Sequence, residues 1–316
     1  MSTPPNTISG LVSVIIPVHN RLEYLPQAIE SALGQSYPQV EVIVVDDGSP
    51  KDPAPVVARF DSRVRLVRKT NGGLASARNF GIAHALGEYL NFLDDDDFLE
   101  PTALEDLRDA MRAYPSATWA AGRYDYVDPS GVPLRRPPRA AYQSGNVYQP
   151  MIHHNLMGAP SVVLALSEVV RQLSAFDESP QFHMAEDYDL WLRLARVSPL
   201  AVTQQKVSNY RVHGQQFTQS QREKFIGAVL AVLQKQRAIA PPGHDEDFCR
   251  AIAQVHLSFG DFLYLGGDAM RARAQWQLAA AGGVLSARGL RWRRGKSRLP
   301  SPVLRVLRTT RKCLRI

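Results

Sequence analysis

Residues 40–49, VEVIVVDDGS, indicate how this chain folds. The run Val40–Val45 is apolar except for Glu41, mostly β-branched and too short for a helix, so it predicts a buried strand that ends abruptly in the polar sequence DDGS. Further strands are predicted at 12–18, 64–68 and 89–93, alternating with helical patterns at 22–33, 54–60 and 75–86. This alternation predicts an α/β fold with a mostly parallel open sheet and flanking helices.

Polar side chains gather where the predicted strands end. His19 and Asn20 follow the first strand, the pair Asp46-Asp47 follows the second, and four aspartates follow the fourth. In open sheets of parallel strands, ligands bind beyond the carboxyl ends of the strands, so these clusters predict the site. Asn20 with Glu23 also predicts a capping box for the first helix.

The four consecutive aspartates, Asp94–Asp97, indicate a cation site. Because side chains alternate along an extended chain, we expect the first and third to face one way and the second and fourth the other. Their repulsion would be relieved by Mg²⁺ or Mn²⁺, which binds one or two carboxylates together with phosphate oxygens. The alternative is a solvated acidic turn that caps a helix starting near Pro101.

Six segments, taken in order, resemble successive motifs of the family 2 glycosyltransferases. They are VSVIIPVHN (12–20), VIVVDDGS (42–49), NGGLASARNFG (71–81), FLDDDD (92–97), EDYDLWLR (186–193) and YRVH (210–213). The resemblance covers about residues 10–215. It implies a nucleotide-diphospho-sugar-binding (GT-A) fold, a divalent metal and transfer with inversion at the anomeric carbon.

The resemblance implies that Asp47 accepts a hydrogen bond from the donor's nucleobase. A carboxylate can accept the imide N3–H of uracil or thymine, whereas the alternative role for Asp47 is an Asx-type turn. Arg78, in a helix opened by Gly72 and Gly73, suits an anionic phosphate, although a surface arginine is the alternative. The remaining donor contacts are expected at Pro17, His19, Glu23, Asp94 and Asp95.

The expected metal ligands are Asp96, as the main ligand, together with Asp94 and His213. An imidazole nitrogen is a credible ligand for Mn²⁺, and a purely structural histidine is the alternative.

The resemblance places the catalytic base at Asp187. This residue would take the proton of the acceptor hydroxyl, while Glu186 would hold the acceptor or tune the base. The alternative is that both acids only stabilise the dipole of the helix that they begin. Asp189 is expected to point away, and residues 151–161, which include a His-His pair, and 176–178 are expected on the acceptor side.

Length and composition fit a globular protein of about two domains: 316 residues, 45 % apolar and 21 % charged. We predict a glycosyltransferase domain at 10–220, a helical appendage at 221–287 with one tetratricopeptide-like helix pair, and a basic amphipathic tail at 288–316. The tail holds eleven Lys and Arg and no acidic residue. It predicts binding to an anionic membrane surface, with nucleic acid as the rival partner.

Two cysteines cannot form a disulfide framework, and the amino terminus lacks the pattern of a signal peptide. No run approaches the ~18 apolar residues that a membrane span requires. These features predict a cytoplasmic protein held peripherally on the inner face of the cell membrane.

The predicted function is a metal-dependent inverting glycosyltransferase. It would move a sugar from a UDP- or dTDP-sugar to a hydroxyl of a lipid-linked or cell-surface glycan. The alternatives are a nucleotidyltransferase, a dehydrogenase, and a non-catalytic nucleotide-sugar- or carbohydrate-binding protein. A dehydrogenase is disfavoured because no GxGxxG follows Val18.

Overall fold

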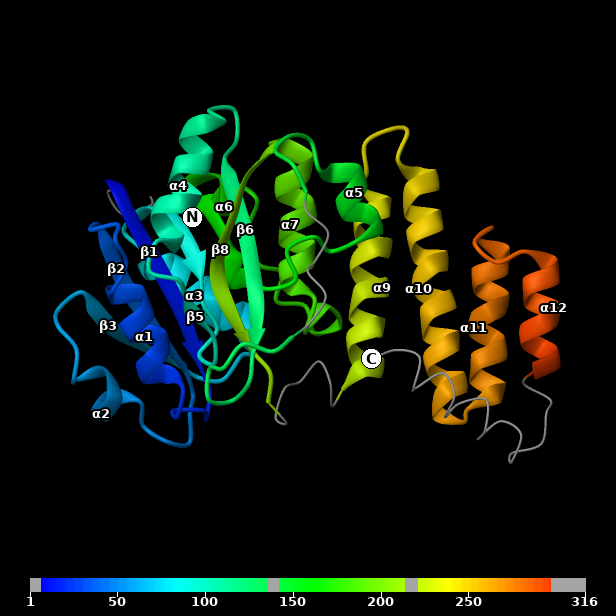
Figure 1. The fold of residues 1–316 in the computed structure, drawn as a ribbon, viewed down its shortest axis with the longest axis horizontal. Coiled ribbons are helices and arrows are strands. Elements are labelled where there is room, and N and C mark those ends of the chain that lie inside the picture. The colour runs from blue at the N-terminus through cyan, green and yellow to red at the C-terminus, as the bar shows by residue number, and fades with distance from the viewer. Residues whose placement is uncertain (1–6, 136–141, 214–220, 297–316) are drawn as a thin grey trace. The chain divides into compact units, whose positions relative to one another are not determined.

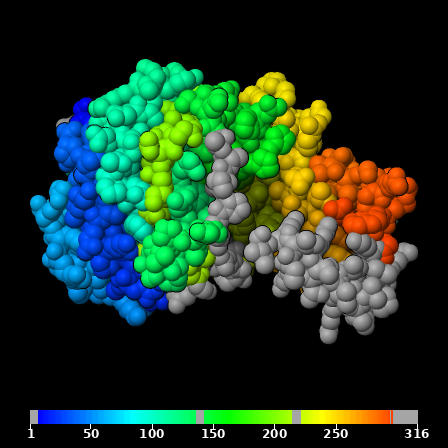
Figure 2. All heavy atoms as spheres, viewed as in Figure 1, coloured from blue at the N-terminus to red at the C-terminus, as the bar shows by residue number. Residues whose placement is uncertain are grey.

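The computed structural model describes residues 7–135, 142–213 and 221–296 (Figure 1). The chain divides into two compact units, the first made of residues 1–151 and 155–221, and the second of residues 152–154 and 222–316. In the space-filling view, side chains close the gaps between the ribbons of the first unit (Figure 2).

The first unit is built on one eight-stranded sheet in the order β3-β2-β1-β4-β7-β6-β8-β5. The strands are β1 (Ile8–Val18), β2 (Val40–Asp47), β3 (Val64–Lys69), β4 (Gly87–Phe92), β5 (Phe98–Leu99), β6 (Trp119–Val127), β7 (Val163–Leu166) and β8 (Leu200–Arg211). The predicted parallel arrangement holds for β1–β4 and for β6 with β8. However, β7 runs antiparallel to both of its neighbours and β5 antiparallel to β8, so the sheet is mixed.

Helices flank this sheet (Figure 1). They are α1 (Leu25–Leu33), α2 (Ala54–Val57), α3 (Leu74–His84), α4 (Ala103–Ala113), α5 (Tyr148–His153), α6 (Ser167–Gln172) and α7 (Glu186–Val197). The predicted capping box before α1 is wrong, because the helix starts at Leu25 after Tyr24 and Asn20 lies in the left-handed region at φ 72°. Asn20 therefore reverses the chain after β1 instead of capping a helix.

The parallel register brings the carboxyl ends of β1, β2 and β4 to one edge of the sheet. Val18 pairs with Asp46, and Leu93, just after β4, donates its backbone N–H to Ile15. Gly81 lets α3 lie close to these strands, since a Cβ there would stand 2.5 Å from Ile15. All of β2 is buried, as expected for a strand covered on both faces.

The second unit contains α9 (Arg222–Ala238), α10 (Asp245–Gly266), α11 (Ala269–Ala281) and α12 (Ala287–Lys296). Helices α10 and α11 pack around the buried residues Ala272, Trp276 and Ala279. Gly260 makes this packing possible, because a Cβ at that position would lie 2.5 Å from Trp276. Residues 297–316 of the predicted basic amphipathic tail lie outside the described residues.

A membrane-spanning helix requires a longer and more apolar segment than any helix within the described residues provides.

Candidate active site

The aspartates after β4 form a turn instead of an extended segment. The backbone N–H of Asp97 donates to the carbonyl of Asp94 at 3.1 Å. The expected alternation of faces is therefore wrong, and Asp97 joins Asp94 and Asp96. One oxygen from each of these three carboxylates lies within 4.8 Å of the others.

A hard divalent cation fits this cluster. Oδ2 of Asp97 is buried and accepts no hydrogen bond from any described residue, which is costly unless a cation or proton occupies the position. Burial raises the pKa of Asp97 well above its usual range, and the charges of Asp96 and Asp94 raise it further. Oxygen ligands from one or two carboxylates are what Mg²⁺ and Mn²⁺ take in proteins.

Two basic side chains, Arg21 and His213, contact Asp96 of this cluster. Arg21 donates from Nη1 to Oδ2 of Asp96 at 2.6 Å and from Nη2 to Oδ1 of Asp95 at 2.9 Å. His213 Nε2 lies 2.8 Å from the same Oδ2 of Asp96. Burial would raise the pKa of Asp96, but the His213 hydrogen bond and the Arg21 charge outweigh it and hold that pKa below its usual range.

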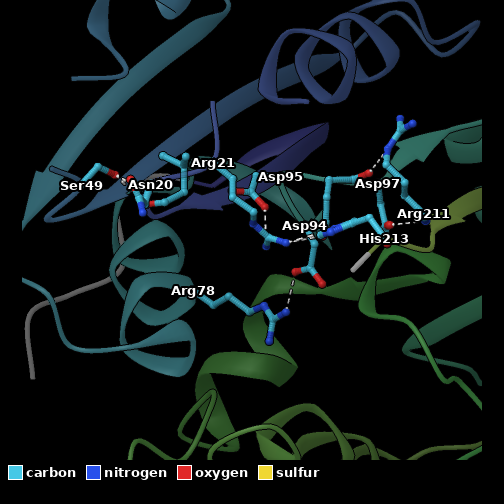
Figure 3. Close-up of polar contacts among 11 residues, drawn as sticks. Asn20, Arg21, Ser49, Arg78, Asp94, Asp95, Asp97, Arg211 and His213 are labelled. Carbon is cyan, nitrogen blue, oxygen red and sulfur yellow. Dashed lines mark hydrogen bonds and ion pairs between the residues drawn. The ribbon is translucent and has the colours of Figure 1, made fainter. Parts of the chain in front are cut away.

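Arg21 is a site residue for which the sequence predicts no role. The available signal was its place directly after His19-Asn20, beyond a strand that ends beside a carboxylate cluster. The sequence does not show how the β1–α1 loop turns, so the contacts of Arg21 with these aspartates could not be predicted from it. That loop is tied to the next strand end by the hydrogen bond between the Asn20 N–H and Oγ of Ser49 (Figure 3).

Arg78 is completely buried between two acids that lie far apart in the sequence. Its Nη2 contacts Oδ1 of Asp94 at 2.7 Å, and its Nη1 contacts Oε1 of Glu186 at 2.8 Å. The guanidinium also lies 5.3 Å from the centroid of the Phe176 ring. Arg78 is therefore no surface arginine, and it ties the aspartate turn to the beginning of α7.

The two acids that begin α7 have different surroundings. Glu186 bonds to Arg78 and accepts the backbone N–H of Met184 at 2.8 Å. Burial raises the pKa of Asp187 to about 7, with the Glu186 charge adding to the effect and Arg78 opposing it. A carboxylate with a pKa near neutrality can act as a general base at physiological pH.

Asp189, which was expected to point away from the site, is paired with another residue of the same helix. It is fully buried and forms an ion pair with Arg193 at 2.8 Å. Arg193 also donates to the carbonyls of Leu173 and Ala175. It thereby holds the left-handed residues Ser174 and Ala175 in place.

Asp47 already accepts three hydrogen bonds. Its Oδ1 accepts from Lys69 Nζ at 2.9 Å and from the Gly72 N–H at 3.0 Å, and its Oδ2 accepts from the Gly73 N–H at 2.9 Å. The alternative of an Asx-type turn belongs to Asp46, which accepts the N–H of Ser49. Lys69 went unnoticed in the sequence, because nothing there shows that β3 ends beside β2.

The remaining candidates fall into three groups. Pro17 is buried in β1 opposite Val45, whereas His19 and Glu23 are exposed beyond the same strand end. The predicted acceptor region contributes Phe176, whose backbone carbonyl accepts from Asn79. His153 lies in the second unit, where its Nε2 is 3.2 Å from Asp247.

Comparison with known proteins agrees with this geometry. Residues 13–162 match the family described as glycosyl transferase family 2. An uncharacterized glycosyltransferase of Rickettsia typhi is 31 % identical over 259 residues, covering 78 % of this chain and 80 % of that protein. The chondroitin synthase of Escherichia coli is 31 % identical over 209 residues, which cover 65 % of this chain and 29 % of that protein.

Among solved structures, S. aureus TarS 1-349 in complex with UDP-GlcNAc superposes with a TM-score of 0.69 at 18 % identity. The match covers 91 % of each chain and confirms the GT-A fold. This chain therefore belongs to glycosyltransferase family 2, and it is an enzyme of the nucleotide-sugar transferase class.

Removing the Arg78 charge should destabilise the first unit strongly. Arg78→Gln leaves Asp94 and Glu186 without their shared cation, and breaking a buried ion pair typically costs about 3–5 kcal/mol. Urea unfolding, followed by tryptophan fluorescence, measures this loss. The matched control is Arg112→Gln, which breaks an exposed pair with Asp109 and should change stability by less than about 0.5 kcal/mol. Equal stability of the two variants would contradict this interpretation of Arg78.

Proposed function

We propose that this enzyme transfers a sugar, with inversion and with a divalent metal, from a UDP- or dTDP-sugar to a hydroxyl group. The observation that carries the proposal is the double ion pair of Arg78. These ion pairs fix the distance between two features of the site. One is the carboxylate cluster, which suits a cation, and the other is Asp187, whose pKa burial raises to about 7. An inverting transfer needs these two features on opposite sides of the anomeric carbon.

In this proposal, Asp94, Asp96 and Asp97 hold Mn²⁺ or Mg²⁺, with His213 beside them. A bound cation would stabilise the negative charge that develops on the leaving diphosphate. Arg78 adds a positive charge beside the cluster and fixes the position of Asp94 by an ion pair at 2.7 Å.

Asp187 is the proposed general base. It takes the proton from the acceptor hydroxyl as that oxygen attacks the anomeric carbon from the face opposite the diphosphate. Glu186 is held by Arg78 and by the N–H of Met184, so its charge stays close to Asp187 and keeps the pKa of that residue high.

The nucleobase would bind at Asp47, framed by Pro17, His19 and Glu23. Oδ2 of Asp47 accepts one backbone hydrogen bond, which leaves it able to accept the N3–H of uracil or thymine. The three hydrogen bonds from Lys69, Gly72 and Gly73 fix the carboxylate in one orientation. The structure of TarS, which has the same fold, is in complex with UDP-GlcNAc, and this supports a nucleotide-sugar donor for this enzyme.

For the acceptor, we propose a lipid-linked or cell-surface glycan in polysaccharide assembly. The similarity to a chondroitin synthase supports a glycan acceptor. The basic tail would hold the enzyme peripherally at the inner face of the cell membrane, close to such acceptors.

Release of free nucleotide from a panel of UDP-, dTDP-, GDP- and ADP-sugars with Mn²⁺ tests the proposed donor class. UDP- or dTDP-sugars should be hydrolysed or transferred, and UDP should inhibit more strongly than ADP. Asp47→Ala should lose this preference, because adenine offers no imide N–H and a missing base contact typically costs ~1–3 kcal/mol. The exposed Asp52→Ala is the matched control. Equal inhibition by GDP would refute the selectivity, and binding without turnover would favour a non-catalytic protein.

Asp187→Asn should abolish transfer while leaving UDP binding intact, with a loss of about 10²- to 10⁴-fold in rate. Because the base must be ionised and burial raises the pKa of Asp187 to about 7, wild-type kcat should fall as pH drops below about 7. A pH–rate profile of the wild type and of the exposed-acid control Asp109→Asn measures this limb. Wild-type activity of Asp187→Asn would assign the base elsewhere.

Deleting residues 297–316 should weaken binding to anionic membranes. This segment carries six Lys and Arg, each contributing up to ~1 kcal/mol near an anionic surface. The deletion spares α12, which is anchored by the Arg293–Asp261 ion pair. Flotation with phosphatidylserine vesicles, compared with neutral vesicles and with a full-length variant whose six basic residues become Gln, measures the effect. Unchanged flotation would eliminate the segment as an anchor, and binding to RNA alone would favour a nucleic-acid partner.

A further inference from the structure

Arg21 occupies a position that a bound cation would contest. Its guanidinium spans Asp95 and Asp96, and Nη1 lies 3.3 Å from Nε2 of His213 (Figure 3). Asp96 is also one of the three carboxylates whose oxygens converge within 4.8 Å. A divalent cation and the Arg21 guanidinium would therefore compete for one carboxylate and repel each other at this distance.

The side chain of Arg21 is able to leave this position. It is 25 % exposed, in contrast to Arg78, whose side chain is 1 % exposed. It extends from the β1–α1 loop, between the end of β1 and the start of α1, and not from a regular element.

A diphosphate would give the displaced guanidinium a new partner. Arginine binds phosphate oxygens through two parallel hydrogen bonds, as it binds carboxylates. A cation that enters alone must break both Arg21 ion pairs without replacement. A cation that enters with a nucleoside diphosphate allows Arg21 to exchange two carboxylates for phosphate oxygens.

We propose that Arg21 is an internal counter-cation that fills the carboxylate cluster until donor and metal arrive together, and then binds the donor's diphosphate. This inference rests on the proposed function, because it takes a nucleoside diphosphate as the donor. By exchanging the carboxylates for the diphosphate, Arg21 makes the binding of the metal and of the nucleotide cooperative. By linkage, the cation tightens nucleotide binding by the same factor as the nucleotide tightens cation binding.

Titration of Mn²⁺ by electron paramagnetic resonance, with and without UDP, tests the inference. The Mn²⁺–UDP complex that forms without protein is measured separately and subtracted. In the wild type, UDP should tighten Mn²⁺ binding by about 10-fold or more, within the usual range of coupling between sites. In Arg21→Gln, Mn²⁺ alone should bind at least about 5-fold tighter than in the wild type, and UDP should tighten Mn²⁺ binding by a smaller factor than it does in the wild type.

Two further variants separate charge from structure. Arg21→Lys should retain part of the coupling, because it keeps the charge but not the paired geometry. Arg65→Gln removes a half-exposed arginine that pairs with Glu41, away from the cluster, and should keep wild-type coupling. Circular dichroism confirms that each variant is folded.

The outcomes distinguish this inference from the proposed function. A folded Arg21→Gln that binds Mn²⁺ no more tightly than the wild type, with the UDP effect intact, overturns the role of Arg21 and leaves the glycosyltransferase proposal standing. A wild-type protein that binds neither Mn²⁺ nor UDP overturns both.

Discussion

The two ion pairs of the buried Arg78 are the interaction on which the site depends. They connect the turn after β4 to the first residue of α7, although Asp94 and Glu186 lie 92 positions apart in the sequence. A buried guanidinium is tolerated only when its charge is balanced and most of its donors are satisfied, so the two elements must meet at one distance. Because Asp187 directly follows Glu186, the same two ion pairs also fix the position of Asp187.

The parallel strands explain why so many charges collect in one place. Strands β1, β2 and β4 end at the same edge, and each end continues into a loop whose side chains are polar. The resulting excess of acid is only partly neutralised by Arg21, Arg78 and Lys69. The site therefore has a net negative charge, which would favour the binding of a cation.

Much of the fold and the family could be predicted from the sequence, because buried strands and motif order are local features. The residues assigned from the resemblance keep their roles as predictions. The sequence could not decide between a turn and an extended segment at Asp94–Asp97, since both have the same composition. The contacts of Arg21 and Lys69 depend on which strand ends are neighbours, and the reversed direction of β7 depends on a connection that has no sequence signature.

The Asp189–Arg193 pair has a consequence for how mutations in this region are interpreted. Arg193 fixes the backbone of Ser174 and Ala175, and the next residue, Phe176, lies against the guanidinium of Arg78. A substitution of Asp189 would therefore release a loop, then an aromatic ring, and finally the ion pair that positions α7. Such a variant would lose activity although Asp189 is fully buried and paired with Arg193. A loss of turnover caused by a substitution in α7 can therefore be assigned to chemistry only when folding is measured alongside it.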